Sequence, residues 1–297
     1  MKITITGSLG NISGSLTKKL VAQGHDVRVI SSNINKAEAI RELQATPLIG
    51  SIEDYAFVKQ SFQGSDAVYL MIPPNFSTPD YKAFTIAVGK NYARAIQETG
   101  ISYVVNLSSS GSPLAGQPPL ENYQNLETFL DELPSLNVMH LRPGGFYSNF
   151  YGSIELIKYQ CIIGNNYGDN VNMVLSHPED IADAAADAFS TLSFTGKNVK
   201  YIISDTKNGR QIAQMLGAAI GKPDLTWIQF TDEQLLQGLM QNGFSKEAAQ
   251  HYIVDMGIAI REGLLASHYA QHAKEVAGSR NFTTFAEDFA RVYQQQG

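Results

Sequence analysis

The sequence predicts an α/β protein built on a doubly wound parallel sheet, with a smaller, mostly helical C-terminal lobe. Two observations carry this prediction. Short apolar stretches alternate with segments of helical periodicity through the first half of the chain, and stretches such as AVYLMI and YVVNL are apolar almost throughout. Strands that are apolar on both faces belong in a sheet covered by helices on both sides, and right-handed crossovers then produce a doubly wound sheet.

The expected elements follow one another in a regular order. The six expected strands are KITIT, HDVRVIS, TPLIG, SDAVYLMIPP, ISYVVNLSSSG and LNVMHLRPGG. The helices expected between them are ISGSLTKKLVAQG, NKAEAIRELQ, SIEDYAFVKQSFQG, YKAFTIAVGKNYARAIQETG and LENYQNLETFLDEL. Capping residues such as Ser51 and terminal glycines such as Gly24 mark the helix boundaries.

The alternation loosens after residue 150. An alanine-rich helix, HPEDIADAAADAFSTL, and a further strand, NVKYIIS, precede a stretch that is helical and amphipathic. We therefore expect a dinucleotide-binding domain over residues 1–150, to which residues 176–205 return. Residues 206–297 are expected to form the smaller lobe that meets a substrate or a partner.

Composition excludes several function classes. The formal net charge is −6 and there is no cluster of Lys and Arg, so nucleic acid is not an expected partner. A lone cysteine, Cys161, rules out a disulfide framework within the chain. No apolar run reaches the roughly 20 residues that span a bilayer, and MKITITG lacks the apolar core of a secretory signal. We expect a cytoplasmic protein, monomeric or homodimeric, that acts on a small molecule and not at a membrane.

The stretch TGSLGNISGS joins the first strand to the first helix. Gly7 permits the sharp turn, and Gly10 lets the backbone approach a pyrophosphate at the helix N-terminus. The third small position of this spacing is Ser13, which still permits close packing of the helix on the strand. A tight turn without a ligand is the alternative, but its place after the first strand of a βαβ series favours a ligand.

Six motifs together resemble the NmrA-like family of the atypical short-chain dehydrogenase/reductase superfamily. These are TGSLGNIS, LIGSIED, AVYLMIPP, VVNLSSSG, LRPGGFYSNF and HPEDIADAAA, and RQIAQMLGAAIGKPDLTW also matches the family's final lobe. The resemblance implies a Rossmann domain that binds NAD(P). The cofactor contacts that we expect are Gly7, Ser8, Leu9, Gly10, Asn11, Ile12, Ser32, Asn33, Lys36, Ile52, Ile72, Pro73, Pro74, Ser108, Ser109 and Pro143.

The end of the second strand bears on the choice of cofactor. Enzymes that prefer NAD usually place a carboxylate there for the ribose 2′-hydroxyl, but this chain has Ser31, Ser32 and Asn33, followed by Lys36. These donors would suit a 2′-phosphate, so we expect NADP, with NAD as the alternative. NADP-preferring relatives often carry Arg where Ser32 stands. The family often has Asp where Ser51 stands, so the usual adenine contact is missing. The same stretch also reads as a capped turn without a ligand role.

Ordinary short-chain reductases use a Tyr-x-x-x-Lys pair, in which the lysine lowers the tyrosine pKa. Here Tyr123 is followed four residues later by Glu127, which would raise that pKa. Tyr123 is therefore a weak catalytic candidate, and a core or rim aromatic is the preferred interpretation. In the family, this departure accompanies either direct hydride transfer to quinones or dinucleotide sensing without catalysis.

The expected substrate contacts follow the sixth strand. Phe146, Tyr147 and Phe150 could stack on a planar substrate, and Asn149 could anchor it by its amide. Core packing is the alternative for these rings. His268 and His272 share a helical face near Glu275, but no second cluster accompanies them, so no metal is expected.

These observations predict an NAD(P)H-binding oxidoreductase. Its expected substrate is a quinone-like or other small planar carbonyl compound, reduced by direct hydride transfer. The alternative is a non-catalytic, NAD(P)-sensing regulatory protein.

Overall fold

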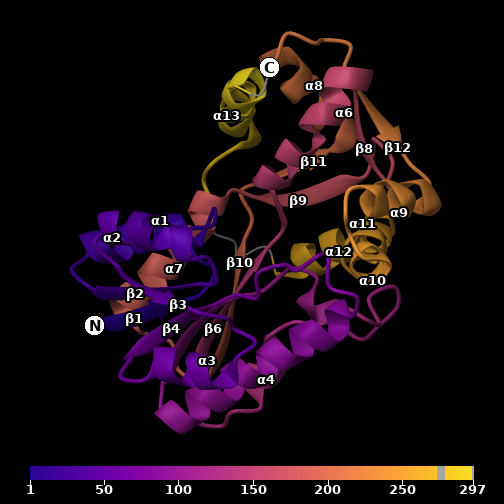
Figure 1. Cartoon of the computed structure of the whole chain (residues 1–297). Helices are drawn as coiled ribbons and strands as arrows, with labels where there is room; N and C mark the ends of the chain where they lie inside the picture. Colours follow the sequence, from indigo (N-terminus) through magenta and orange to yellow (C-terminus); the bar gives the residue numbers. More distant parts are fainter. Residues whose placement is uncertain (273–277, 296–297) are drawn as a thin grey trace.

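A computed structural model describes residues 1–272 and 278–295 of the chain (Figure 1). Seven parallel strands form the central sheet, in the order β10-β6-β5-β4-β1-β2-β3. Their bounds are β1 Lys2–Ile5, β2 Asp26–Ser31, β3 Thr46–Ile49, β4 Ala67–Leu70, β5 Tyr103–Leu107, β6 Asn137–Pro143 and β10 Lys197–Ile202. The order reverses at β1, between β2 and β4, which is the point where doubly wound sheets bind ligands.

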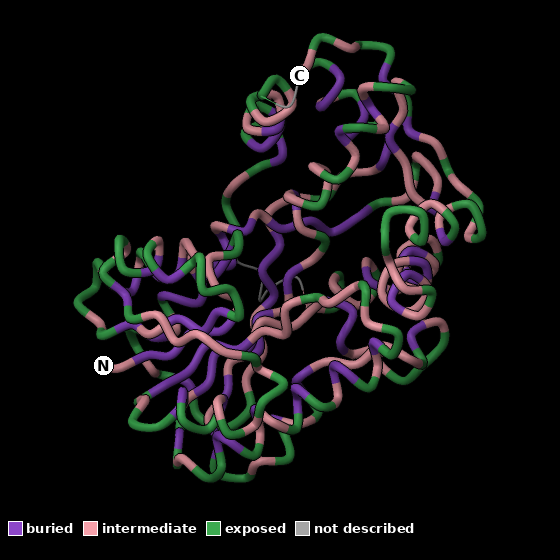
Figure 2. Tube along the Cα trace, viewed as in Figure 1, coloured by how far each residue is buried: buried purple, intermediate pink, exposed green. Residues whose placement is uncertain are grey.

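Helices cover both faces of this sheet, as the apolar strands predicted. On one face lie α1 (Ser13–Ala22), α2 (Ala37–Glu42) and α7 (Pro178–Thr191), which share a buried core with β1. On the other face lie α3 (Tyr55–Phe62), α4 (Tyr81–Thr99) and α5 (Glu127–Asp131). Figure 2 shows the strands as an almost continuously buried layer between partly exposed helices. The doubly wound Rossmann sheet is confirmed.

A second lobe stands over the carboxyl ends of the strands (Figure 1). It contains a three-stranded sheet, β11-β9-β7, and a two-stranded sheet, β12-β8. The strand bounds are β7 Gly145–Phe146, β8 Ile162–Asn165, β9 Asn172–Ser176, β11 Asp205–Asn208 and β12 Thr226–Gln229. The α-helix bounds are α6 Ile154–Gln160, α8 Gly209–Ala219, α9 Asp232–Gln241, α10 Lys246–Ala248, α11 Asp255–Arg261, α12 Leu264–Gln271 and α13 Phe282–Gln295.

Shorter helical turns complete the chain. Three are 3₁₀ turns, namely η1 Ile34–Lys36, η2 Ser112–Leu114 and η3 Tyr147–Ser153, and η4 (Ala249–Val254) is a π-helix.

The core of the second lobe draws on more of the chain than residues 206–297. Buried residues from η3, α6, β8 and β9 pack with α8 and α13 in one cluster. The segment between the sixth sheet strand and α7 therefore lies with the second lobe, while α7 and β10 return to the Rossmann part. None of the described helices is long and apolar enough to cross a membrane.

The helix expected over LENYQNLETFLDEL is the main local error. The structure forms turns before residue 127, so Tyr123 precedes α5 instead of lying on it. The Asn125 side chain accepts the backbone N–H of Glu127 at 2.8 Å, which starts the helix late. Asparagine competes for backbone hydrogen bonds in this way and favours caps over helix interiors.

Candidate functional site

The glycine turn follows β1 and leads into α1. Gly7 has φ +90°, and a Cβ there would lie 2.6 Å from Ser13 Oγ and 2.7 Å from Met71 Sδ. Glycine is therefore required at this position by both backbone conformation and space. Ser13 is buried and its hydroxyl donates to the Thr6 carbonyl at 2.9 Å, which ties the start of α1 to the end of β1.

Gly10 differs from Gly7 in what surrounds it. It is exposed, and an added Cβ would meet only the carbonyl oxygen of Gly7, at 3.2 Å. The fold therefore needs Gly10 less than Gly7, and a bare backbone at an exposed helix start is suited to a phosphate group. This is the cradle that a dinucleotide would require.

A cavity of about 320 Å³ lies at the carboxyl ends of the strands, on the β2 and β3 side of the turn. Its lining is Gly7, Ser8, Ile30, Ser31, Ser32, Gly50, Ser51, Ile52, Glu53, Pro73, Pro74, Asn75 and Phe84. Six of the expected cofactor residues meet here, and they follow four separate strands, β1, β2, β3 and β4. The lining residues that were not among the expected contacts are Ile30, Ser31, Gly50, Ser51, Glu53, Asn75 and Phe84.

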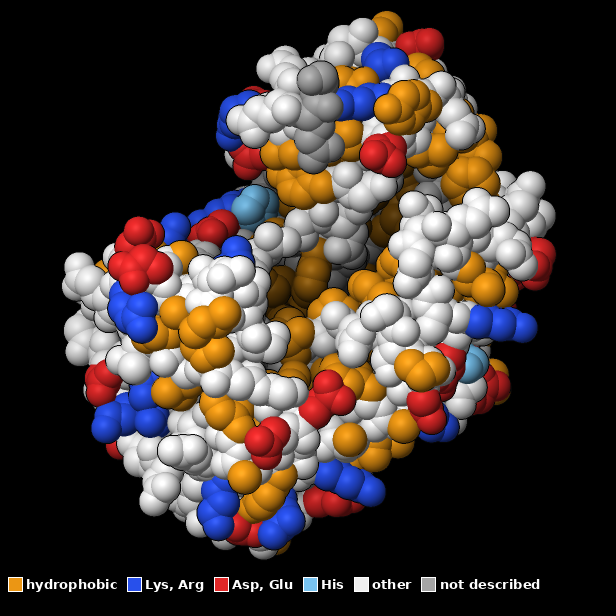
Figure 3. Space-filling view, viewed as in Figure 1, with side chains coloured by type: hydrophobic (Ala, Val, Ile, Leu, Met, Phe, Trp, Pro, Cys, Tyr) orange, Lys and Arg blue, Asp and Glu red, His pale blue; other side chains and the backbone are white. Residues whose placement is uncertain are grey.

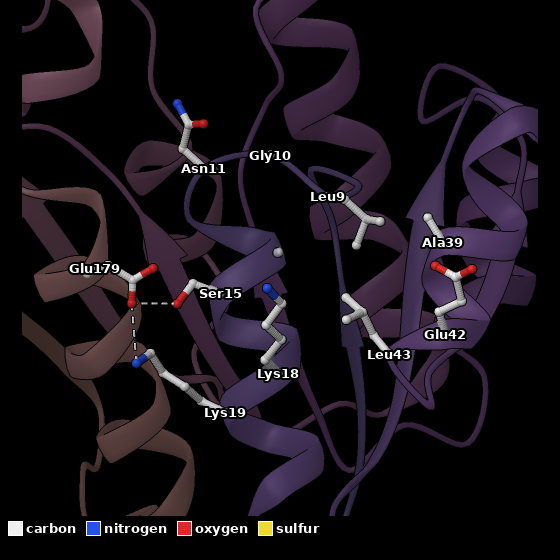
Figure 4. A pocket seen from close by; sticks show the side chains of 11 residues that line it. Leu9, Gly10, Asn11, Ser15, Lys18, Lys19, Ala39, Glu42, Leu43 and Glu179 are labelled. Atoms are coloured by element: carbon white, nitrogen blue, oxygen red, sulfur yellow. Dashed lines mark hydrogen bonds and ion pairs between the residues drawn. The ribbon is translucent and has the colours of Figure 1, made fainter. Parts of the chain in front are cut away.

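A larger cavity, of about 600 Å³, lies on the other side of the glycine turn. Figure 4 shows its lining, with Leu9, Gly10 and Asn11 above α1 and the α2 side chains opposite. Glu179 accepts the Ser15 hydroxyl at 2.7 Å and lies 3.3 Å from Lys19 Nζ. The charged residues that line this groove are two carboxylates, Glu42 and Glu179, and two lysines, Lys18 and Lys19, and its other lining residues include the expected cofactor contacts Leu9, Gly10 and Asn11. The residues that follow β2, β3 and β4 line the smaller cavity instead, so size alone does not make this groove the whole dinucleotide site.

Hydrogen bonds organise the turn after β2. Ser8 Oγ donates to Ser31 Oγ at 3.0 Å, and Ser31 Oγ also accepts the backbone N–H of Asn33 at 3.2 Å. Asn33 Oδ1 caps η1 by accepting the N–H of Asn35 at 2.9 Å. The capped turn is therefore present, but Ser32 and Lys36 are exposed and Ser32 lines the smaller cavity.

The serine turn, residues 108–112, follows β5. The N–H of Ser108 donates to Leu141 O at 2.8 Å and that of Ser110 donates to Pro143 O at 2.8 Å, so the turn stays paired with β6. The hydroxyl of Ser108 lies 2.5 Å from Glu127 Oε1 and 2.7 Å from Ser112 Oγ. Ser109 Oγ accepts the N–H of Gly111 at 3.0 Å.

The main partners of Glu127 are Arg142 and Ser108 rather than Tyr123. Its carboxylate, buried beneath the serine turn, forms a bidentate pair with Arg142 at 2.6 and 2.9 Å. Burial opposes ionisation of Glu127, but hydrogen bonds from Arg142 and Ser108 outweigh it and hold its pKa below the ordinary value. Burial is the main cause that raises the pKa of the Tyr123 phenol, followed by nearby Tyr252, and Glu127 adds least.

The aromatic residues after β6 lie mostly in the core of the second lobe. Tyr147 is fully buried, and its ring centroid lies 5.1 Å from that of Phe282. Phe150 packs against Phe282 at 5.5 Å, and Phe146 packs against the sheet core, whereas Asn149 is exposed. Tyr147 therefore packs in the core, which was the alternative to stacking on a substrate.

A different aromatic cluster lies where the two lobes meet. Tyr123 stacks on Tyr252 of η4, with centroids 6.3 Å apart, and Tyr252 also contacts Phe76 at 5.4 Å. Phe76 stacks on Phe244 at 4.5 Å. No periodicity links these residues, because they come from a loop after β4, the turns before α5 and the second lobe. Figure 3 shows a hollow between the lobes with apolar side chains on its floor.

His268 of α12 and His272, which directly follows that helix, lie against Tyr201 of the edge strand β10. His268 Nδ1 lies 2.9 Å from the Tyr201 hydroxyl, and the His268 and His272 rings stack at 4.9 Å. Glu275 lies outside the described residues. Within residues 1–272 and 278–295, no group of three or more side chains is arranged to hold a metal ion.

Comparison with known proteins agrees with this architecture. The model of the NmrA-like family matches residues 1–287. A photosystem II assembly factor from Synechocystis is 23% identical over 219 residues, which cover 72% of this chain and 66% of that protein.

Two solved structures share the fold over nearly their whole length. An NADPH-dependent quinone oxidoreductase from Escherichia coli, complexed with NADPH, has a TM-score of 0.77 and 17% identity, covering 98% of this chain and 99% of its own. Triphenylmethane reductase from Citrobacter, complexed with NADP(H), has a TM-score of 0.78 and 16% identity, covering 98% and 100%.

Proposed function

This chain belongs to the NmrA-like family, and on that premise we propose that it is an NADPH-dependent oxidoreductase. The proposed substrate is a quinone-like or other small planar carbonyl compound. The observation that carries the proposal is the glycine turn, in which Gly10 is exposed and Gly7 and Ser8 line the cavity at the ends of β1, β2, β3 and β4.

The glycine turn and the residues of the smaller cavity would each hold a different part of the cofactor. Backbone around Gly10 would meet the pyrophosphate at the start of α1. Ser32, with Lys36 nearby, would meet the 2′-phosphate, and Ile52 would line the adenine slot. Pro73 and Pro74 would shape the loop over the middle of the cofactor. The nicotinamide end would then extend over β4 and β5, towards the serine turn and the hollow between the lobes.

When bound, NADPH would supply the hydride. The chain's own contribution would be to orient the cofactor and the substrate, because no lysine activates Tyr123. Burial and Tyr252 raise the pKa of the Tyr123 phenol, so it stays protonated near neutral pH and is a weaker proton donor than a free tyrosine. A quinone oxygen would take its proton from solvent.

Sensing without catalysis is the second candidate. The observation in its favour is the same missing lysine, together with a curated relative that is named as an assembly factor. A sensor would bind NADPH through the same turn but would not turn it over.

The test is NADPH oxidation by the purified chain, offered a planar quinone such as menadione and a non-planar dione of similar size such as camphorquinone. The proposal expects turnover that is faster with the planar compound and absent in Gly10→Val. NADPH binding without turnover on any quinone would favour the sensor. No binding of NADPH would reject both.

A further inference from the structure

The buried ion pair beneath the serine turn carries an inference about how the active end of the cofactor is held. Glu127 lies on α5, Arg142 on β6 and Ser108 at the end of β5. Both oxygens of Glu127 accept from the Arg142 fork, and one also accepts the Ser108 hydroxyl. Three elements therefore meet at one carboxylate.

Such a buried pair is weak evidence for stability, because desolvation offsets most of the attraction between the charges. Its geometry, however, is restrictive. A bidentate guanidinium fixes the plane of the carboxylate, and the remaining lone pairs of Oε1 then set the place of Ser108 Oγ. Ser108 in turn lies 2.7 Å from Ser112 Oγ, so the first and last residues of the turn are tied together.

The other side of the turn is also held. A Cβ at Gly111 would lie 3.1 Å from Cε of Met256, which places α11 of the second lobe directly on the turn. The Ser108 and Ser112 hydroxyls contact each other, and Ser110 and Ser112 are buried, whereas Ser109 is half-buried and its hydroxyl borders Tyr123. Ser109 lies just past the carboxyl end of β5, next to β4 in the sheet.

We propose that Glu127, locked by Arg142, is a positioning residue that anchors the serine turn and thereby presents Ser109 to the nicotinamide half of the cofactor. The inference rests on the proposed function, since it needs a dinucleotide in the crevice. It gives Glu127 the task of ordering the turn, at the position where ordinary relatives carry the activating lysine.

The test compares the whole cofactor with its adenine half. NADPH and the 5′-diphosphate of 2′-phosphoadenosine are each titrated calorimetrically into wild type and Glu127→Gln. Glu132→Gln, at the end of α5, is the matched control. Glu132 is exposed at the end of the helix. We expect Glu127→Gln to weaken NADPH by about tenfold, as one or two lost hydrogen bonds would, and to leave the adenine half within about twofold. The control should change neither.

Equal weakening of both ligands would mean a merely structural role and would overturn the proposal, as would unchanged NADPH binding. If Glu127→Gln does not fold, Arg142→Lys makes the same comparison, because lysine keeps the charge but loses the fork. A chain that binds no dinucleotide gives a different result. The wild type itself then binds neither ligand, and both proposals fall together.

Discussion

The Asp180 carboxylate accepts the backbone N–H of Arg280 at 3.1 Å, across 100 residues of sequence. Asp180 lies in the first turn of α7, and it also accepts from Ser279 N at 3.0 Å and from the Arg280 guanidinium. Ser204 Oγ donates to it at 2.5 Å. One side chain, 5% exposed, thus joins the Rossmann part to the segment that enters α13.

Asp180→Asn should therefore destabilise the protein strongly. The amide would retain the shape but present an N–H₂ group where several donors converge, and Arg280 would keep only Asp183 as a charge partner. We expect a loss of about 2–4 kcal/mol of unfolding free energy, measured by urea denaturation. The control is Asp187→Asn on the exposed side of α7, which should change stability by less than about 0.5 kcal/mol. Similar losses in both variants would contradict the assigned role.

The same carboxylate predicts how stability depends on pH. Burial works to raise the pKa of Asp180, but hydrogen bonds from Ser204, Arg280 and Ser279 outweigh it, so the pKa lies below its ordinary 3.8. A carboxyl with a lowered folded-state pKa contributes stability above 3.8 and loses it as the pH falls through the folded value. Wild type should lose stability on acidification in this range, and Asp180→Asn should lose less. Parallel pH curves for the two proteins would count against this linkage.

Gly10→Val should abolish NADPH binding without unfolding the protein. A valine would fill the place of the pyrophosphate, while the structure leaves its Cβ room against all atoms but the Gly7 carbonyl oxygen. The measurement is the NADPH-induced rise in melting temperature, with far-UV circular dichroism as the check of folding. Gly14→Ala is the control, because its Cβ would make only ordinary contact with Leu9, at 3.5 Å or more. A normal thermal shift in Gly10→Val would refute the pocket assignment.

Ser32→Asp should reverse the choice of cofactor. Ser32 lines the smaller cavity and offers a hydroxyl, so wild type should bind NADPH modestly more tightly than NADH. An aspartate would repel the 2′-phosphate and accept a hydrogen bond from the 2′-hydroxyl. Isothermal titration calorimetry of NADPH and NADH with wild type and Ser32→Asp measures the affinities to be compared. If wild type binds NADH as tightly as NADPH, the turn after β2 acts only as a helix cap.

Tyr123→Phe should leave turnover on quinones within about tenfold of wild type, since loss of a true general acid costs 10²–10⁴ in rate. The physical reason is that burial raises the phenol pKa and no lysine lowers it. Steady-state kinetics with menadione gives the comparison. A fall of several hundredfold would restore an ordinary tyrosine mechanism.

The Rossmann sheet could be predicted from the sequence, because the alternation of apolar strands and helices is a local signal that burial on both faces of the sheet requires. It also located the turn at Gly7 and Gly10, since a strand that turns sharply into a helix needs a residue without Cβ. Ser32, Ile52, Pro73 and Pro74 were expected as cofactor contacts from the resemblance to the NmrA-like family, and all four line the smaller cavity.

The partner of each polar or aromatic side chain depends on the packing of the whole chain. Glu127 pairs with Arg142 rather than acting mainly on Tyr123, because α5 begins at Glu127 and its carboxylate lies beneath the serine turn. Tyr147 is buried because α13 brings Phe282 and Phe285 onto it from the far end of the chain. Contacts between residues so distant in sequence leave no periodicity to read, and it is the packing of the whole chain that selects them.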